Sequence, residues 1–460
     1  MKKILDLKKV RLSLNAIIIF DEILQDDRIR CFCGLLDDLL DKEPNCERIL
    51  ISYHIFYKSM AGINWVEYLI KKLFESEYAF TALSSNSGNV EVNDCIKRDA
   101  ARDLRIIQAL AEITPGDIIS LTAALFRDRI PQGEEEIFTG PLWAENWPVW
   151  RWEFPDYIIN ETDLKDLPAP RWLEAMKSFF LKQFIHQENW ESNAPLLMDY
   201  YQKAGCGIFG TFAAFKLKEN NRKLEGIDNP DTVRIRNLIC QEREQTLVLR
   251  NTESFLQGFP ANNVILYGNR GTGKSSLVKA LLNEYVAKGL RLVQLKKNQI
   301  GMFPELVKEL AKIPLKFIIF IDDLSFNDVE EDYKNLKSLL EGGVESRPGN
   351  VLIYATSNRK HLVKESFSDR RSDDVQAQDN MEEKLSLADR FGITVTFLSP
   401  DQETYLRIVE GLASQHHINM ERDELRQKAL KWVMMHNGRS GRTARQFIDH
   451  LIGDLAVSRK

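Results

Sequence analysis

The chain has 460 residues, of which 44% are hydrophobic and 28% are charged, and this balance excludes a disordered or membrane-embedded chain. Its length allows two or three domains. A formal net charge of −5 excludes a long-range basic field that attracts nucleic acid, although a local basic patch stays open.

The six cysteines are scattered and show no paired C-x-x-C spacing, so we expect reduced thiols and no zinc site. Near the N-terminus, the apolar run at residues 16–20 is short and ends at Asp21 without a small-residue cleavage site. We therefore expect a cytoplasmic protein without a membrane partner.

Residues 1–215 are expected to form a mainly helical region of unknown role. Apolar residues recur at helical spacing at 101–111, 117–126 and 172–184. Four tryptophans lie between residues 143 and 152. Such a cluster either packs in a core, which is the more frequent arrangement, or stacks on a base or a peptide.

After an expected linker at residues 216–236, β-rich runs alternate with helical stretches over residues 237–399. This alternation is typical of a parallel sheet covered by helices. We predict an α/β domain with a five-stranded parallel sheet and helices on both faces. The predicted strands are 264–267, 290–295, 317–321, 351–355 and 393–397.

A helix start is predicted directly after the fifth strand, with Ser399 as N-cap, Pro400 at the first helical position and Gln402 completing a capping box. Residues 400–460 are therefore expected to form a small helical lid. The predicted chain therefore consists of a helical N-terminal region, a linker, an α/β domain and this C-terminal lid.

The residues that follow the first predicted strand match G-x-x-x-x-G-K-[ST] and open a helix. Glycines let backbone N–H groups point at phosphates, Lys274 reaches the terminal phosphates, and the Ser275 hydroxyl binds Mg²⁺. The alternative, a glycine-rich turn with an incidental lysine, does not account for the flanking strand and helix. The expected ATP-binding residues are Gly268, Asn269, Arg270, Gly271, Thr272, Gly273, Lys274, Ser275 and Ser276.

Polar residues also end the third and fourth predicted strands. Asp322 is expected to hold Mg²⁺, directly or through water. Asp323 occupies a position that resembles that of the AAA+ glutamate, and this resemblance implies that it orients and deprotonates the attacking water. Acidic residues often end strands without such a role, so the spacing after the phosphate-binding motif carries this prediction. Asn358 follows the next strand and is expected to contact the γ-phosphate and the water, or else to cap the following helix.

Taken together, these motifs resemble AAA+ ATPases, and in particular a bacterial family of predicted AAA+ ATPases of unknown function, domain-of-unknown-function family 815. The resemblance covers about residues 220–455 and includes Asn251-Thr252, residues 386–392 and Ser440-Gly441-Arg442. It implies a P-loop AAA+ core with ATP and Mg²⁺ as cofactors. It implies no substrate, since the family has none assigned.

The resemblance also implies roles for two arginines. Arg390 resembles an arginine finger that acts on the ATP of a neighbouring subunit, which implies an ATP-dependent homo-oligomer; a salt bridge to Asp389 or Glu383 is the alternative. Arg442 resembles a lid arginine that contacts its own subunit's ATP, and we prefer it to Arg445. A solvated basic turn is the alternative for this segment.

Two departures from AAA+ proteins bear on function. Asp323 stands where a glutamate is usual, and residues 295–303 lack the aromatic-apolar-glycine pore loop of unfoldases. We expect an ATPase, slow or stimulated by its partner, that acts on an unknown macromolecule held by the N-terminal region. The alternative is a non-enzymatic or very slow ATP-dependent switch. Nothing in the sequence indicates nucleic acid, and nothing excludes it.

Overall fold

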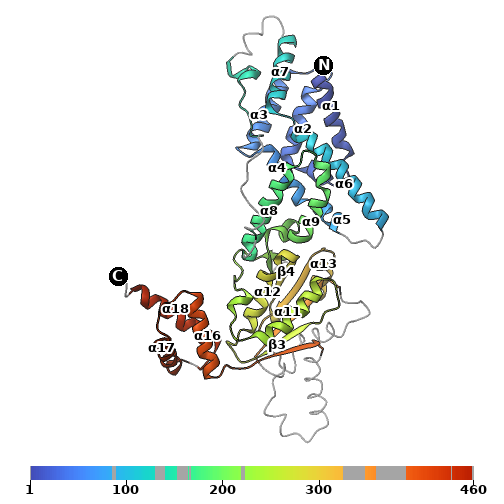
Figure 1. Ribbon diagram of the computed structural model, residues 1–460. Helices are drawn as coiled ribbons and strands as arrows, with labels where there is room; N and C mark the ends of the chain where they lie inside the picture. Colours follow the sequence, from blue (N-terminus) through green and yellow to red (C-terminus); the bar gives the residue numbers. More distant parts are fainter. Residues whose placement is uncertain are drawn as a thin grey trace. The chain divides into compact units, whose positions relative to one another are not determined.

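The computed structural model describes residues 2–84, 90–129, 140–152, 164, 167–218, 223–324, 348–358, 390–436 and 438–457 (Figure 1). They form two compact units, each described here by itself. The first unit contains Met1–Asp166 and Leu173–Thr211, and the second contains Leu167–Trp172 and Phe212–Lys460. All six cysteines are free thiols.

The first unit is helical. Its predicted helices at 101–111, 117–126 and 172–184 lie within α6, α7 and α8. No single helix of the described residues has the length and apolar character to cross a membrane, although α6 and α7, bent by 60°, pass that test as a pair. The helices are α1 Lys2–Ser13, α2 Asp27–Leu39, α3 Cys46–Met60, α4 Trp65–Glu75, α5 Glu77–Ser84, α6 Val90–Ala111, α7 Pro115–Arg129, α8 Ala169–His186, α9 Ala194–Ala204 and α10 Gly207–Thr211.

The tryptophan-rich segment contributes to the core of the first unit. Trp147 and Trp150 are each 3% exposed. Their rings lie 4.5 Å and 5.6 Å from that of Tyr53, and Trp150 meets Phe56 edge-on at 5.0 Å. The Tyr53 hydroxyl donates to the Pro148 carbonyl at 2.7 Å. These two tryptophans therefore pack inside the unit and offer no stacking surface.

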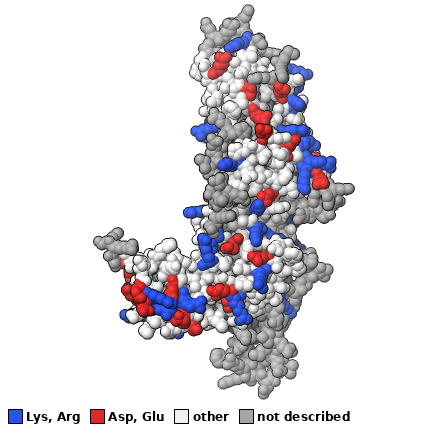
Figure 2. All heavy atoms as spheres, viewed as in Figure 1, with Lys and Arg blue, Asp and Glu red and all other residues white. Residues whose placement is uncertain are grey.

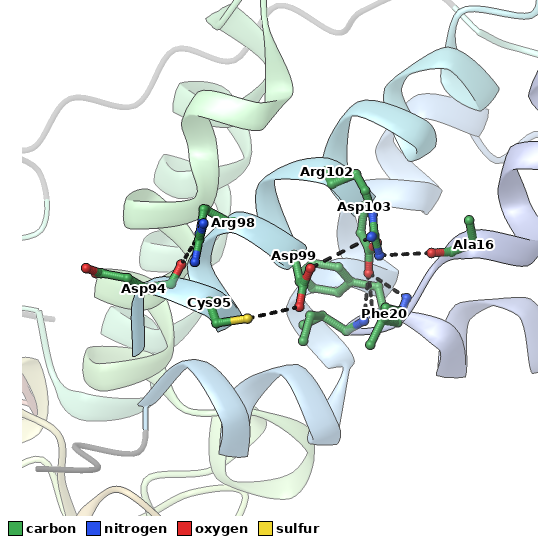
Figure 3. A network of polar contacts seen from close by, with 10 residues as sticks. Ala16, Phe20, Asp94, Cys95, Arg98, Asp99, Arg102 and Asp103 are labelled. Carbon is green, nitrogen blue, oxygen red and sulfur yellow. Dashed lines mark hydrogen bonds and ion pairs between the residues drawn. The ribbon is translucent and has the colours of Figure 1, made fainter. Parts of the chain in front are cut away.

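A buried carboxylate holds the irregular segment between α1 and α2 (Figure 3). Asp103 is fully buried, and its Oδ2 accepts hydrogen bonds from the backbone N–H groups of Ile18 at 2.8 Å and Ile19 at 2.6 Å. Arg102 donates to the Ala16 carbonyl at 3.0 Å. Because buried N–H groups outside helices and strands need acceptors, Asp103 replaces the partners that this segment lacks.

The second unit is built on a sheet with the strand order β2-β1-β4-β5-β6-β3-β7. All neighbouring strands are parallel except β1 and β2. The predicted α/β fold, with a mostly parallel sheet, a C-terminal helical lid and a helical N-terminal region, is confirmed. The strands are β1 Ala214–Leu217, β2 Leu224–Gly226, β3 Val264–Gly268, β4 Leu290–Leu295, β5 Lys316–Ile321, β6 Val351–Ser357 and β7 Ile393–Phe397.

The prediction of five strands is wrong in number, because the sheet has seven strands within the residues that the structure describes. All five predicted strands are present as β3 to β7, and β1 and β2 extend the sheet beyond β4. The additional strands have only four and three residues, which is too short for apolar alternation to reveal them. Residues 216–236, expected as a linker, contain β2 and the end of β1.

Helices α11 Glu242–Leu256 and α12 Lys274–Tyr285 lie against strands of this sheet, and α13 Phe303–Leu310 lies between β4 and β5 in the chain (Figure 1). Every residue of β6 and all but the first of β5 are buried, as expected for central strands covered on both faces. Since β3 pairs with β6 and β6 with β5, the loop after β3 lies beside the carboxyl ends of both. Ligands of parallel α/β sheets bind at such an edge.

The lid consists of α16 Gln402–Gln415, α17 Arg422–Met435 and α18 Gly441–Val457 around its own apolar core. The predicted N-cap is wrong: Asp401 caps α16 by accepting a hydrogen bond from the Thr404 N–H at 2.8 Å. An aspartate is as good a cap as serine, and the Ser399 hydroxyl instead accepts from the Asn269 side chain at 2.6 Å. Charges of both signs are interspersed over the lid in Figure 2.

Candidate nucleotide-binding site

The segment expected to bind phosphate, called here the phosphate loop (residues 268–275), joins the end of β3 to the start of α12. Gly271 and Gly273 have φ angles of +78° and +96°, which only glycine adopts readily. The chain turns sharply at both residues and then enters the helix at Lys274. The N-terminal end of a helix attracts anions, so the loop presents the potential that phosphates require.

Lys274 is 5% exposed and lies inside the loop. Its ammonium donates to the carbonyls of Gly268 and Asn269, both at 2.8 Å, and to Asn358 Oδ1 at 3.2 Å. Burial lowers the pKa of Lys274, and the two aspartates after β5 oppose that shift. An added phosphate would favour the charged ammonium further, because it supplies the counter-charge that the loop itself lacks.

The two predicted magnesium ligands meet directly. The Ser275 hydroxyl donates to Asp322 Oδ1 at 2.7 Å. Hydroxyl and carboxylate oxygens suit Mg²⁺, which keeps several waters and takes one or two protein ligands beside substrate phosphates. Within the described residues no three His, Cys, Asp or Glu side chains gather around a common point. The donor set therefore fits Mg²⁺ brought in with a nucleotide better than a permanently held metal ion.

Asp323 adopts an unusual backbone conformation at the end of β5. Its φ is +55°, a value that costs a residue other than glycine about 1 kcal/mol. Asn358 Nδ2 donates to Asp323 Oδ1 at 2.6 Å, while the Asn358 carbonyl oxygen faces Lys274. The structure thus brings Asp323, Asn358 and Lys274 into one connected polar network.

Thr356 also belongs to this network, although no sequence motif assigns it a role. It is 2% exposed, its hydroxyl donates to Asp322 Oδ1 at 2.5 Å, and it accepts from the Asp323 N–H at 2.9 Å. One hydroxyl therefore orients the carboxylate of one aspartate and the backbone of the next. The sequence signal is only that a threonine lies in the last residues of β6.

Thr356→Val keeps the shape of this side chain and removes its hydroxyl. We expect ATP turnover to fall about tenfold, because Asp322 and Asp323 both lose a hydrogen bond worth about 1 kcal/mol. Affinity for ADP without magnesium should stay within about twofold, since the Thr356 hydroxyl bonds to Asp322 and to the Asp323 N–H, which serve the metal ion and the attacking water. Phosphate release and calorimetric titration of the purified variant measure both effects. Unchanged turnover would reduce Thr356 to a packing residue.

The start of α18 rests directly on the phosphate loop. The Arg442 N–H donates to the Gly271 carbonyl at 3.2 Å. A Cβ atom on Gly271 would lie 2.9 Å from Ser440 Oγ and 3.1 Å from Arg442 Cβ, so this contact requires glycine. Both Arg442 and Arg445 line the cavity described next, so the choice between them stays a prediction.

A cavity of about 440 Å³ lies between the phosphate loop and the lid, and is called here the nucleotide cavity. Its polar lining includes residues 270–276, both aspartates, Thr356 and Asn358. Its apolar lining consists of Leu238, Ile239, Ile408 and Leu412. This volume is typical of small-molecule sites, and a lining of both kinds suits a charged polyphosphate joined to a flat base.

Three of the predicted site residues do not line the nucleotide cavity in the described part of the chain. Gly268 and Asn269 contribute carbonyls to Lys274 and are not among the described residues that line the cavity. Arg390, which immediately precedes the turn into β7, is also absent from that lining. Asp389 and Glu383, its alternative partners, lie outside the described residues. The role of Arg390 as a finger stays a prediction.

The similarity to known proteins lies mainly in the second unit of the chain. A family profile described as "Protein of unknown function (DUF815)" matches residues 210–455. The proteasome-activating nucleotidase of Methanoregula boonei is 34% identical over 165 residues, which cover 30% of this chain and 38% of the relative. The 26S proteasome regulatory subunit 4 homolog of Encephalitozoon cuniculi is 43% identical over 155 residues, or 31% of this chain and 36% of that protein.

These matches thus span less than two fifths of each relative's length. Among solved structures, the Thermotoga maritima RuvB Holliday junction branch migration motor is 13% identical, with a TM-score of 0.30. That alignment covers 48% of this chain and 72% of the other. The sequence relatives therefore concern part of the chain, and all but the last two residues of the first unit lie outside the matched family region.

Proposed function

The chain belongs to the family described as protein of unknown function (DUF815), and from that premise we propose that it binds Mg²⁺ and ATP in the nucleotide cavity and hydrolyses ATP to ADP and phosphate. The similarity to nucleotidases supports an ATP-dependent activity. The observation that carries the proposal is the polar network of Lys274, Ser275, Asp322, Asp323 and Asn358, connected through Thr356, in the wall of a cavity that also has apolar lining residues.

Binding uses groups that the loop already presents. Lys274 exchanges the carbonyls of Gly268 and Asn269 for the β- and γ-phosphate oxygens, while backbone N–H groups of the loop donate to the same phosphates. Ser275 and Asp322 would hold Mg²⁺. The ion, when bound, neutralises charge on the phosphate oxygens.

Hydrolysis needs a base and an orienting group beside the γ-phosphate. The Asp323 carboxylate takes a proton from water, whose oxygen forms a bond to the γ-phosphorus while the bond from that phosphorus to the bridging oxygen breaks. ADP leaves with the electron pair of the broken bond. Asn358 lies between Asp323 and Lys274, so its amide holds the base and faces the reacting phosphate.

Asp323→Asn tests this assignment. We expect phosphate release to fall by a hundredfold or more, about the contribution of a general base, because an amide cannot accept the proton. ATP affinity should stay within about threefold. Asp231→Asn is the matched control, since Asp231 pairs with Lys279 at 3.5 Å outside the nucleotide cavity. An Asp323→Asn variant that turns over at the wild-type rate would remove Asp323 from the mechanism.

The segment after β4 favours a remodeller, loader or nucleotide switch over a threading motor. It forms a short 3₁₀ helix, η9 Lys297–Met302, in which Ile300 is fully buried. Gln299, 3% exposed, donates to the Leu217 carbonyl of β1 at 3.2 Å. A segment anchored to the sheet in this way does not present an aromatic side chain to a central pore.

We propose that the helical first unit holds the macromolecular partner.

The alternative function is an ATP-dependent switch with very slow or no turnover. It is favoured by Asp323, whose side chain is one methylene shorter than that of glutamate and whose Oδ1 already accepts from Asn358 at 2.6 Å. Both functions share ATP binding and an ATP-dependent oligomer in a cytoplasmic setting. Phosphate release with and without candidate partners distinguishes the enzyme from the switch.

A further inference from the structure

Gln241 stands immediately before α11 and belongs to a segment, residues 236–241, that none of the motifs above includes. It occupies the N-cap position, but its side chain makes no capping hydrogen bond. Instead Gln241 Nε2 donates to the Thr272 carbonyl of the phosphate loop at 2.7 Å. The side chain therefore reaches across 31 positions of sequence to the loop.

The Gln241 amide packs against Gly273, the residue just before Lys274. A Cβ atom at position 273 would overlap this amide, so the close approach requires glycine there as well as the positive φ. In the described part of the chain, Gln241 Oε1 is buried and has no hydrogen-bond partner. Burying an unsatisfied acceptor costs about 1–3 kcal/mol, so stability alone does not account for a polar side chain here.

The opposite side of the same segment contacts the lid. Gln415, the last residue of α16, donates to the Arg236 carbonyl at 3.1 Å and accepts from Asn237 at 3.4 Å. Ile239 packs against the apolar core of the lid, where a Cβ atom on Gly411 would overlap it. The segment thus touches α16 on one side and, through Gln241, the phosphate loop on the other.

We propose that Gln241 is a positioning residue that couples the lid to the phosphate loop, an inference that rests on the nucleotide binding proposed above. Contacts with the lid fix the position of residues 236–239. The hydrogen bond from Gln241 in turn fixes the orientation of the peptide between Thr272 and Gly273, so a shift of the segment shifts this peptide. Gln241 does not take part in the chemistry. It sets the direction of the loop N–H groups that receive phosphate, so an altered lid contact changes nucleotide affinity through this side chain.

A double-mutant cycle on the full chain tests the coupling, with Mg²⁺ and ADP as the probe and calorimetry as the measurement. Gln241→Met should weaken ADP binding about tenfold, as expected for one lost hydrogen bond. Gln415→Met, which removes only the lid contact, should weaken it about threefold. The double variant should bind ADP with the same affinity as Gln241→Met alone, because without the Gln241 side chain a change in the lid contact no longer affects the phosphate loop.

Gln299→Met is the matched control, since it removes another buried amide-to-carbonyl hydrogen bond in the second unit, away from the cavity. It should lower the melting temperature without changing ADP affinity. If Gln241→Met does not fold, Gln241→Glu keeps the side-chain size, lacks the donor and completes the same cycle.

Three outcomes would overturn the coupling while leaving the proposed function intact. They are additive effects in the double variant, unchanged affinity in Gln241→Met, and an equal loss of affinity in Gln299→Met. Failure of the wild-type chain to bind ADP or ATP would instead remove the proposed function, and the coupling with it.

Discussion

Lys274→Ala is expected to weaken ATP binding at least about a hundredfold. Hydrogen bonds to a charged group are worth about 1.5–3 kcal/mol each, and Lys274 supplies the buried ammonium of the phosphate loop. We expect a large loss because this side chain is 5% exposed and lies between two loop carbonyls and Asn358, where no other side chain of the described residues can replace it without rearrangement. Calorimetric titration with Mg²⁺ and ATP measures the effect.

Lys279→Ala is the control for this prediction because Lys279 lies on the same helix, α12, and pairs with Asp231 outside the nucleotide cavity. It should bind ATP as the wild-type chain does. Circular dichroism of both variants shows whether the helix is retained. Equal ATP affinity in Lys274→Ala and in the wild-type chain would mean that the phosphates bind elsewhere.

Arg390→Ala is expected to leave ATP binding intact and to lower hydrolysis on the order of 10³-fold, the lower end of the range for arginine fingers. Arg390 lies just before β7 and does not belong to the described residues that line its own cavity. If it acts on ATP, it therefore acts across an interface, in a head-to-tail oligomer that forms with ATP bound.

Mixing variants tests this arrangement directly. Lys274→Ala keeps the finger and loses the phosphate site, whereas Arg390→Ala keeps the site and loses the finger. Their mixture should hydrolyse ATP faster than either alone. A mixture of Lys274→Ala with Asp323→Asn should not recover, because no subunit then has both bound ATP and its base. A wild-type chain that stays monomeric with ATP by light scattering, and whose rate is linear in protein, would contradict catalysis in trans.

The parts of the fold that the sequence predicts are those with strong local signals. Five apolar runs of four to six residues predicted β3 to β7, and the glycine-lysine motif predicted the start of α12 to within one residue. The short strands β1 and β2 carry no such signal. They form because Phe215 can pair with Val293 at the edge of β4, a contact between distant residues that no local pattern contains.

The same distinction holds for the candidate site. Asp322 and Ser275 were predicted from motifs, and their contact at 2.7 Å follows from the neighbouring strand ends. Thr356 was not predicted, because its role depends on the register that pairs Ile321 with Ala355 and so places the next residues of β5 and β6 side by side. Register is set by packing across the sheet and cannot be read from one strand.

Gln241 was missed for a related reason. Its contact with Thr272 depends on how the 236–241 segment crosses between the lid and the loop, which is a tertiary arrangement. A glutamine before a helix is a weak signal by itself, since serine, threonine, aspartate and asparagine are the usual caps. Only the direction of its side chain in the structure indicates a role.

A single-turnover experiment tests hydrolysis at this site most directly. The purified full chain, in excess over ATP labelled at the γ-phosphate and with Mg²⁺ present, is quenched at intervals and the free phosphate is counted. This format detects even slow chemistry, because it needs no product release and no second round. We expect the wild-type chain to convert its bound ATP to ADP and phosphate, while Asp323→Asn retains it as ATP. A wild-type chain that binds ATP and returns it intact would contradict hydrolysis and favour the switch.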